Sequence, residues 1–357
     1  MKHPFWLAAL LLFGGCIKVQ PFVPLVNKAD SQPLPKLSVL SSADQQVLTQ
    51  LIANETYFDA AVILRNDSVL YTYGEINTPF NAASVRKSVF SALYGIAAAK
   101  GLLHPDSSLA SLGIDDATNP LQPTEKQATL AQLLAARSGI YLPSLGESAG
   151  MVRRKPARGA YLPGEHFYYN SWDFNALPII LQKITNQSVE QLIDTWLAQP
   201  LGFTNYTTEH VTYQYDNTVS EYPQTRLYIS AMDLARFGAL YAMQGRWRGQ
   251  QIIDSAWVAL STSKISKEPN DRDLVEHPFM EGYGYLWWID DETGTFWADG
   301  AGGHFVIVHP AKKLTVVLRN NTGMSGLGVL LYSATNNYEG NEGGDKVYKA
   351  LLNLLAP

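Results

Sequence analysis

The sequence predicts an α+β fold: an antiparallel sheet built from N-terminal and C-terminal segments, flanked by helices, with an inserted domain that is mostly helical. Two observations support this prediction. Short β-rich runs separated by turn residues occur near both ends of the chain, in residues 58–73 and 294–319. Between them, roughly over residues 102–280, the hydrophobic spacing is mostly that of helices. A sheet that draws strands from both ends of a chain leaves the middle as an insertion.

Residues 1–40 are expected to precede the globular domain, which we place at residues 41–357. Residues 1–16 have the order of a signal peptide, with a basic start, an apolar stretch too short to span a bilayer, and a Gly-Gly-Cys end. This end resembles a bacterial lipobox, in which Cys16 becomes lipidated; a plain secretory signal cleaved nearby is the alternative. Residues 17–40 contain several prolines and suit an extended tether.

Composition limits the location and the partners of the protein. Both interpretations of the N-terminus imply export, and the lipobox implies a bacterial cell-envelope protein on the periplasmic side, held to a membrane by its lipid. Cys16 is the only cysteine, so no disulfide can form within the chain. The net charge of −5 gives no basic excess, so nucleic acid is not an expected partner. The seven histidines are scattered, and neither a metal site nor a cofactor is expected.

The first predicted element of the domain is a β-hairpin, residues 58–65 and 68–73, around an Asn-Asp turn. After a loop of small and polar residues, apolar or small residues recur with helical spacing from Ser84 onward. A Lys-Gly pair at residues 100–101 has the pattern of a helix end. Ser84 therefore falls in the first turn of this helix.

Ser84 and Lys87 form a Ser-x-x-Lys motif, and side chains three residues apart share a helix face. A serine hydroxyl is a poor nucleophile until a base removes its proton, and a lysine whose charge is suppressed can be that base. The helix N-terminus favours negative charge near Ser84, whose N–H is a candidate oxyanion donor. The motif alone is weak, because a second copy stands at Ser261 and Lys264. An ordinary helix surface is the alternative for either copy.

Helices are predicted throughout the insertion, and a β-rich tail follows it. The predicted helices span residues 128–136, 173–185, 188–196 and 231–243, the last N-capped by Ser230. The tail contains predicted strands at residues 294–297, 305–309 and 314–319 and a closing helix at 345–355.

Two further clusters carry groups that an activated serine needs. Tyr168 and Tyr169 lie between a Pro-Gly turn and a predicted helix, and a tyrosine beside a lysine ammonium can shuttle protons. A packing aromatic is the alternative for either tyrosine. A glycine-rich turn precedes the strand at 305–309, and a backbone N–H there is a second candidate oxyanion donor. A tight turn into the strand is the alternative.

These three elements, in this order, resemble the serine β-lactamase and penicillin-binding-protein superfamily. The phrases Pro-Gly-x-x-Phe-x-Tyr-Asn-Ser at 163–171 and Gly-Tyr-Gly-Tyr-Leu-Trp-Trp at 282–288 are closer to its class C β-lactamase-related branch, which includes esterases and nylon-oligomer hydrolases. The resemblance implies a β-lactamase/transpeptidase-like fold and a serine hydrolase. It implies that Ser84 is the acylated nucleophile and Lys87 its base.

The resemblance also assigns the rest of the site. It makes Tyr169 the motif tyrosine, with Tyr168 as the alternative, and lets Ser171 line the site. It places three residues at the strand that usually carries Lys-Thr-Gly, where they would contact the substrate or the oxyanion: Gly302, Gly303 and His304. For His304, a plain turn residue is the alternative.

No Lys-Thr-Gly occurs in the chain. In penicillin-recognising members of the superfamily this triplet helps to hold the substrate carboxylate. Its absence favours hydrolysis of an ester or amide in a small-molecule or short-peptide substrate. The alternatives are a D-amino-acid or cell-wall peptidase, a weak β-lactamase, and a non-catalytic envelope protein of the same fold. Three tryptophans either wall a pocket or pack in the core: Trp172, Trp287 and Trp288. Strand alternation would point one of Trp287 and Trp288 inward and the other outward.

Overall fold

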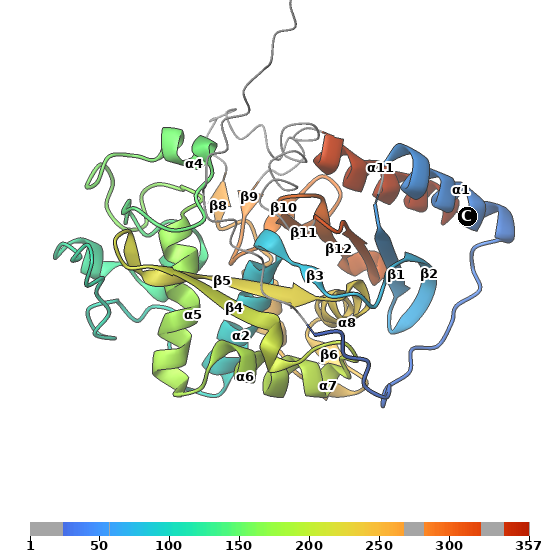
Figure 1. Cartoon of the computed structure of the whole chain (residues 1–357), viewed down its shortest axis with the longest axis horizontal. Coiled ribbons are helices and arrows are strands. Elements are labelled where there is room, and N and C mark those ends of the chain that lie inside the picture. The colour runs from blue at the N-terminus through green and yellow to red at the C-terminus, as the bar shows by residue number, and fades with distance from the viewer. Residues whose placement is uncertain (1–23, 57, 268–281, 323–338, 357) are drawn as a thin grey trace, which may run out of the picture.

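The computed structural model describes residues 24–56, 58–267, 282–322 and 339–356 (Figure 1). The expected signal peptide and Cys16 lie outside these residues. No helix in the described parts of the chain is both long enough and apolar enough to cross a bilayer.

The main sheet has eight strands in the order β2-β1-β13-β12-β11-β10-β9-β8, and every pairing is antiparallel. N-terminal and C-terminal segments meet where β1 pairs with β13, and Val62 lies opposite Val317. This sheet, with helices around it, confirms the predicted fold class. Its strands are β1 (Ala60–Arg65), β2 (Ser68–Gly74), β8 (Ser266–Lys267), β9 (Gly282–Tyr283), β10 (Trp288–Asp290), β11 (Thr295–Gly300), β12 (His304–His309) and β13 (Leu314–Arg319).

Helices cover both faces of this sheet (Figure 1). On β11, the ring of Phe296 lies 6.1 Å from that of Tyr241 on α8 (Ala231–Ala242). The next residue, Trp297, points to the other face and lies 6.1 Å from Tyr348 on α11 (Glu339–Leu354). Helix α1 (Ser42–Gln50) packs beside α11. Alternating residues of a strand are therefore buried on both sides, which explains the continuous apolar runs in the C-terminal strands.

The second part of the molecule lies on the left of Figure 1 and is built around α2 and α5, which are buried along most of their length. A hairpin of β4 and β5 joins β3 in a separate three-stranded sheet. The prediction of a mostly helical insertion does not include this hairpin, whose strand β5 lacks a regular alternation of buried and half-buried residues. The elements outside the main sheet include β3 (Phe80–Asn81), α2 (Arg86–Ala99), α3 (Leu130–Leu134), α4 (Ala149–Arg154), α5 (Ser171–Thr185), α6 (Val189–Ile193), α7 (Gln199–Leu201), β4 (Val211–Asp216), β5 (Ser220–Ile229), β6 (Arg246–Trp247), β7 (Gln250–Gln251) and α9 (Ser255–Ser261), of which α7 and β6 lie below α8 in Figure 1.

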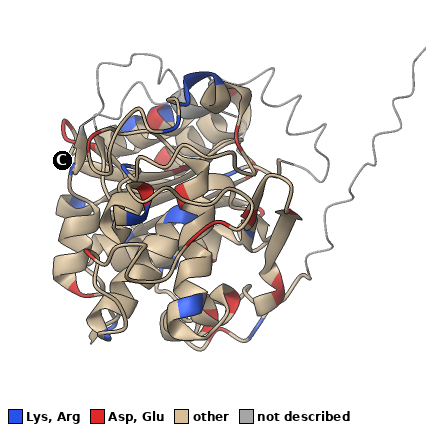
Figure 2. Ribbon diagram, turned by 90° about the vertical axis from the view of Figure 1, so that its left-hand side faces the viewer, with Lys and Arg blue, Asp and Glu red and all other residues tan. Residues whose placement is uncertain are grey.

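Side-chain caps set the helix starts. The Ser230 hydroxyl accepts a hydrogen bond from the Asp233 N–H at 3.0 Å, so α8 begins as predicted. Helix α5 begins at Ser171, two residues before its predicted start, because the Asn170 side chain caps it by accepting from the Trp172 N–H. Basic and acidic residues are interspersed along the ribbon in the view of Figure 2.

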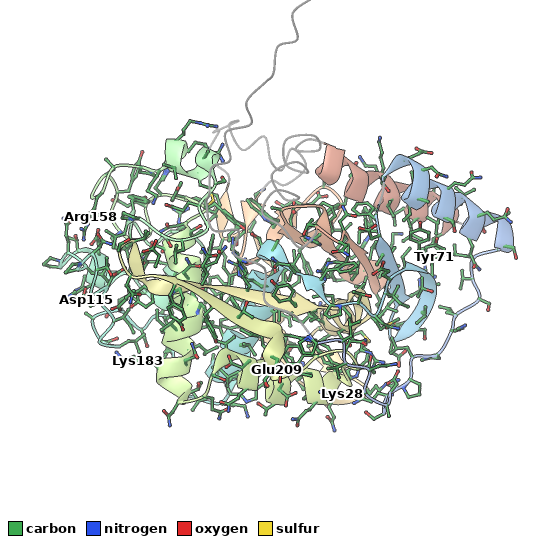
Figure 3. All side chains as sticks on the ribbon, in the orientation of Figure 1. Lys28, Tyr71, Asp115, Arg158, Lys183 and Glu209 are labelled. Atoms are coloured by element: carbon green, nitrogen blue, oxygen red, sulfur yellow. The ribbon has the colours of Figure 1, made fainter. Side chains whose placement is uncertain are left out.

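Residues 24–40, the described part of the expected tether, lie extended against the body of the molecule. The Lys28 N–H donates to the Thr204 carbonyl at 2.8 Å, and Lys28 lies at the lower edge of Figure 3. Asp30 forms an ion pair with the buried Arg236 at 2.7 Å. Further along, the Leu37 N–H donates to a carbonyl of β2. These contacts make the segment a part of the folded structure.

Candidate active site

Three predicted residues meet where α2 begins. The Lys87 Nζ lies 3.2 Å from the Ser84 Oγ and 2.5 Å from the Tyr169 hydroxyl. Lys87 is 5% exposed, whereas Ser84 and Tyr169 are half-buried. The lysine therefore links a serine and a tyrosine that an incoming molecule can still reach. Nucleophilic catalysis needs a base in hydrogen-bonding reach of the attacking oxygen, and these distances meet that requirement.

The backbone before Ser84 is held in an unusual conformation. Ala83 has a φ of +46°, in the left-handed region that costs energy for a residue with a side chain. Two side chains hold its peptide groups: the Asn81 Oδ1 accepts from the Ala83 N–H at 3.0 Å, and the Arg86 Nη1 donates to the Ala83 carbonyl at 2.6 Å. Ser84 follows in a short 3₁₀ turn, Ala83–Val85, in which the Val85 N–H donates to the Ala82 carbonyl at 3.0 Å. The conformation of the segment before Ser84 is therefore held by both side-chain and backbone hydrogen bonds.

The end of β11 packs directly on this turn. A Cβ on Gly300 would lie 2.8 Å from the Ala82 carbonyl oxygen and 3.2 Å from the Ala83 Cβ. Only glycine allows the strand to approach so closely. The C-terminal half of the sheet is thereby in contact with the segment that carries Ser84.

Arg319, at the end of β13, binds the other side of the same segment. Its Nη2 donates to the carbonyls of Phe80 at 2.9 Å and Asn81 at 3.1 Å, and its Nη1 donates to the Ile229 carbonyl at 3.0 Å. The side chain has no exposed surface, and burial lowers the pKa of Arg319 to about 9. A buried cation is tolerated here because peptide carbonyls accept hydrogen bonds from its N–H groups.

His304 completes this network. Its Nδ1 accepts from the Arg319 Nε at 3.0 Å, so the remaining proton sits on Nε2, which lies 3.3 Å from the Thr322 hydroxyl. Burial, and secondarily the Arg319 charge, hold the pKa of His304 well below its ordinary value. Its ring has no exposed surface. Contact between His304 and a leaving group stays a prediction. In the structure the buried ring binds Arg319, which in turn binds the segment before Ser84.

Gly302 and Gly303 form the turn between β11 and β12. Their φ values are +97° and +77°, which favour glycine, and the Asn320 amide donates to the Gly302 carbonyl at 3.1 Å. The turn follows Gly300 and so lies beside the Ser84 segment. A role for its backbone in holding an oxyanion remains a prediction.

The two candidate tyrosines have different surroundings. The Tyr168 hydroxyl donates to the Met151 carbonyl at 2.8 Å, and burial raises the pKa of this phenol. Tyr169 reaches Lys87, and its ring stacks on Trp288 at 5.4 Å between centroids. The structure thus places the hydroxyl of Tyr169, and not that of Tyr168, on Lys87, which in turn contacts Ser84.

Polar residues of the same loop shape the start of α5. The Asn170 amide donates to the Ile140 carbonyl at 2.6 Å and to Asp173 at 2.9 Å. Burial raises the pKa of Asp173 well above its ordinary value. Ser171 is 6% exposed, and its Oγ lies 4.0 Å from the Met151 sulfur. Ser171 stands two residues beyond Tyr169, and its role in lining the site remains a prediction.

The second Ser-x-x-Lys copy does not form a pair. The Ser261 Oγ donates to the Val258 carbonyl at 3.2 Å, and the Lys264 Nζ binds Asp291 at 2.7 Å. The two residues therefore have separate partners.

The three tryptophans are all buried. Trp172 donates to Asp116 at 2.9 Å, and Trp287 stacks on Phe237 of α8. The expectation that Trp287 or Trp288 would point outward is wrong, because protein covers both sides of β10.

Residues 54–350 match the model of the Beta-lactamase family. An uncharacterized protein of Alkalihalophilus pseudofirmus is 24% identical over 272 residues, which cover 69% of this chain and 74% of that protein. A candidate D-alanyl-D-alanine carboxypeptidase of Escherichia coli K12 is 24% identical over 123 residues, or 30% of this chain and 28% of that protein.

Solved structures share the fold at low sequence identity. A candidate 6-aminohexanoate-dimer hydrolase from Bacillus anthracis superposes with a TM-score of 0.61 and 19% identity, covering 92% of this chain and 91% of that one. A candidate β-lactamase from Bacteroides dorei superposes with a TM-score of 0.63 and 15% identity, covering 89% of this chain and 99% of that one.

Proposed function

We propose a reaction for this chain, which belongs to the Beta-lactamase family of serine hydrolases. The chain cleaves an ester or amide bond through an acyl-enzyme on Ser84. One observation carries the proposal: the Lys87 Nζ lies within hydrogen-bonding distance of both the Ser84 Oγ, at 3.2 Å, and the Tyr169 hydroxyl, at 2.5 Å. A buried base joined to a reachable serine is what nucleophilic catalysis requires.

The chemistry follows from this geometry. The Ser84 hydroxyl gives its proton to the Lys87–Tyr169 pair as its Oγ attacks the substrate carbonyl, and the pair then gives a proton to the leaving alcohol or amine. The Ser84 N–H, at the positive end of α2, stabilises the oxyanion, with a second donor from the turn of Gly302 and Gly303. The same pair then takes a proton from water as the water oxygen attacks the acyl carbonyl, and it returns this proton to the Ser84 Oγ when the bond between Oγ and the acyl carbon breaks.

Covalent labelling tests this proposal. A fluorophosphonate should label wild-type protein at Ser84, as located by mass spectrometry, and the protein should hydrolyse short p-nitrophenyl esters. Ser84→Ala should lose both signals. Ser261→Ala is the matched control, because Ser261 belongs to the second Ser-x-x-Lys copy, and it should keep both. Labelling that persists in Ser84→Ala would contradict the proposal.

Export and lipidation form a second part of the proposal, motivated by the N-terminal sequence alone. We expect Cys16 to carry a lipid that holds the protein at the periplasmic side of a bacterial membrane, where it meets small-molecule or short-peptide acyl substrates. Cys16→Ser should move the protein from the detergent phase to the aqueous phase in Triton X-114 partitioning. Equal partitioning of both forms would contradict the anchor.

A cell-wall peptidase or weak β-lactamase is the second candidate. The similarity to a candidate D-alanyl-D-alanine carboxypeptidase over 123 residues favours it, whereas the absence of Lys-Thr-Gly speaks against it. A penicillin adduct on Ser84, or release of D-alanine from a D-Ala-D-Ala peptide, would decide for it. The remaining alternative is a non-catalytic envelope protein of this fold. It would be excluded if the protein turned over any acyl substrate and Ser84→Ala abolished that turnover.

A further inference from the structure

Phe174, in the first turn of α5, contacts both members of the base pair. The Lys87 Nζ lies 4.0 Å from the centre of the Phe174 ring and 3.9 Å from the centre of the Tyr169 ring. The two rings are 4.6 Å apart at an angle of 59°. Phe174 is 2% exposed, so its ring is fixed by packing and shielded from water.

The face of an aromatic ring carries negative charge and attracts a cation, most strongly where water is excluded. An uncharged amine gains far less from the same contact. Burial without such a partner has the opposite effect on a lysine, because it disfavours the ammonium. At Lys87 the ring of Phe174 therefore opposes the effect of burial.

Other ionisable groups around the pair come from several elements. Burial lowers the pKa of Arg86, on α2, to about 10. The Tyr169 charge raises this pKa, and the charge of Arg226 on β5 lowers it. Tyr283 on β9 packs 5.9 Å from the Tyr169 ring, and burial raises its pKa well above the ordinary value. Asp173 on α5 likewise has a pKa raised by burial, which favours its uncharged form. The neighbouring arginine charges disfavour the Lys87 ammonium, whereas the Tyr169 oxygen and the faces of the Tyr169 and Phe174 rings favour it.

We propose that Phe174 is a positioning residue that holds Lys87 in its ammonium form and so sets the pH above which the Lys87–Tyr169 pair can take the Ser84 proton. The second clause rests on the proposed function, whereas the first does not. The ring acts through the lysine and does not touch the reacting serine in the described contacts.

Fluorinated phenylalanines at position 174 test the proposal, since fluorine removes negative charge from the ring face and changes its shape little. The protonation of Lys87 is followed by ¹³C NMR of lysine-labelled protein, with the signal assigned by its loss in Lys87→Met. From phenylalanine to the trifluoro form, the pH of deprotonation should fall stepwise by about one unit, which corresponds to about 1.4 kcal/mol.

The same series at Phe237 is the control. That ring is fully buried and stacks on Trp287 at 6.0 Å, so fluorination there should leave the Lys87 titration unchanged. The proposal fails if Lys87 titrates at the same pH in every Phe174 form, or if the Phe237 series shifts it equally.

The labelling rate of Ser84 separates the two proposals. When the labelling rate is plotted against pH, the rise at the acidic side should move together with the Lys87 titration in the Phe174 series. A moving titration in a protein that never labels at Ser84 would leave the Phe174 inference standing and remove the proposed function. Normal labelling with an unmoved titration would do the reverse.

Discussion

Replacement of Gly300 by alanine tests whether the end of β11 fixes the Ser84 segment. The added Cβ would lie 2.8 Å from the Ala82 carbonyl oxygen, so strand and turn must separate by about half an ångström to restore ordinary contact. A misplacement of about 1 Å in an active site can cost about 100-fold in rate, so half of that predicts about 10-fold slower acylation of Ser84. This loss corresponds to about 1.4 kcal/mol of activation free energy.

The assay compares labelling rates with stability. Fluorophosphonate labelling of Ser84 is timed by mass spectrometry, and urea unfolding shows how much of the variant is folded. Gly249→Ala is the control: its φ of +86° strains an alanine, but nothing lies within 4 Å of the added Cβ. It should lose about 1 kcal/mol of stability and label at the normal rate. A folded Gly300→Ala protein that labels as fast as wild type would refute the reasoning.

Three further predictions concern residues around Ser84. Tyr169→Phe should slow labelling by about 100-fold or more, while Tyr168→Phe should lose about 1 kcal/mol of stability and label normally; equal rates in the two variants would contradict this. Arg319→Met removes the donor that binds three carbonyls, two of them buried and one part-buried, and should lower the unfolding free energy in urea by about 3 kcal/mol; an unchanged midpoint would argue against the network. Burial lowers the pKa of His304 below its unfolded value of 6.5, so its contribution to stability is present above about pH 6.5 and is lost as the pH falls further. In His304→Gln the slope of unfolding free energy against pH should be smaller in that acidic range, by up to the amount that the uptake of one proton on unfolding contributes. An identical slope would exclude this role.

The elements that depend on short windows of sequence were predictable. Two β-rich runs around an Asn-Asp turn predict the hairpin of β1 and β2, and helical spacing predicts α2 with Ser84 at its start. The Ser230 cap likewise predicts the start of α8. The order of strands in the main sheet depends on pairings between distant segments, so local patterns leave it open. The hairpin of β4 and β5 was missed because it lies among predicted helices, although Asp216 and Asn217 are turn residues between its strands.

The candidate site divides in the same way. A spacing of three residues on a helix brings Ser84 and Lys87 together, and the family resemblance points to Tyr169. Nothing local shows that Ala83 adopts a left-handed conformation, because the neighbours that hold it are set by the fold. Phe174 looks like any core residue of α5 in the sequence. Only the spatial meeting of α2 and α5 places its ring on Lys87.

The pairing of β1 with β13 has a consequence for the order of events in folding. Gly300 and Arg319 contact the Ser84 segment from the last strands of the sheet. A chain that has emerged only as far as α9 already contains Ser84, Lys87 and Tyr169, yet it lacks these contacts. On the proposed function, hydrolytic activity should therefore appear only when the sheet closes, so the growing chain would carry Ser84 in an inactive state. Gain of activity would then mark the completion of folding.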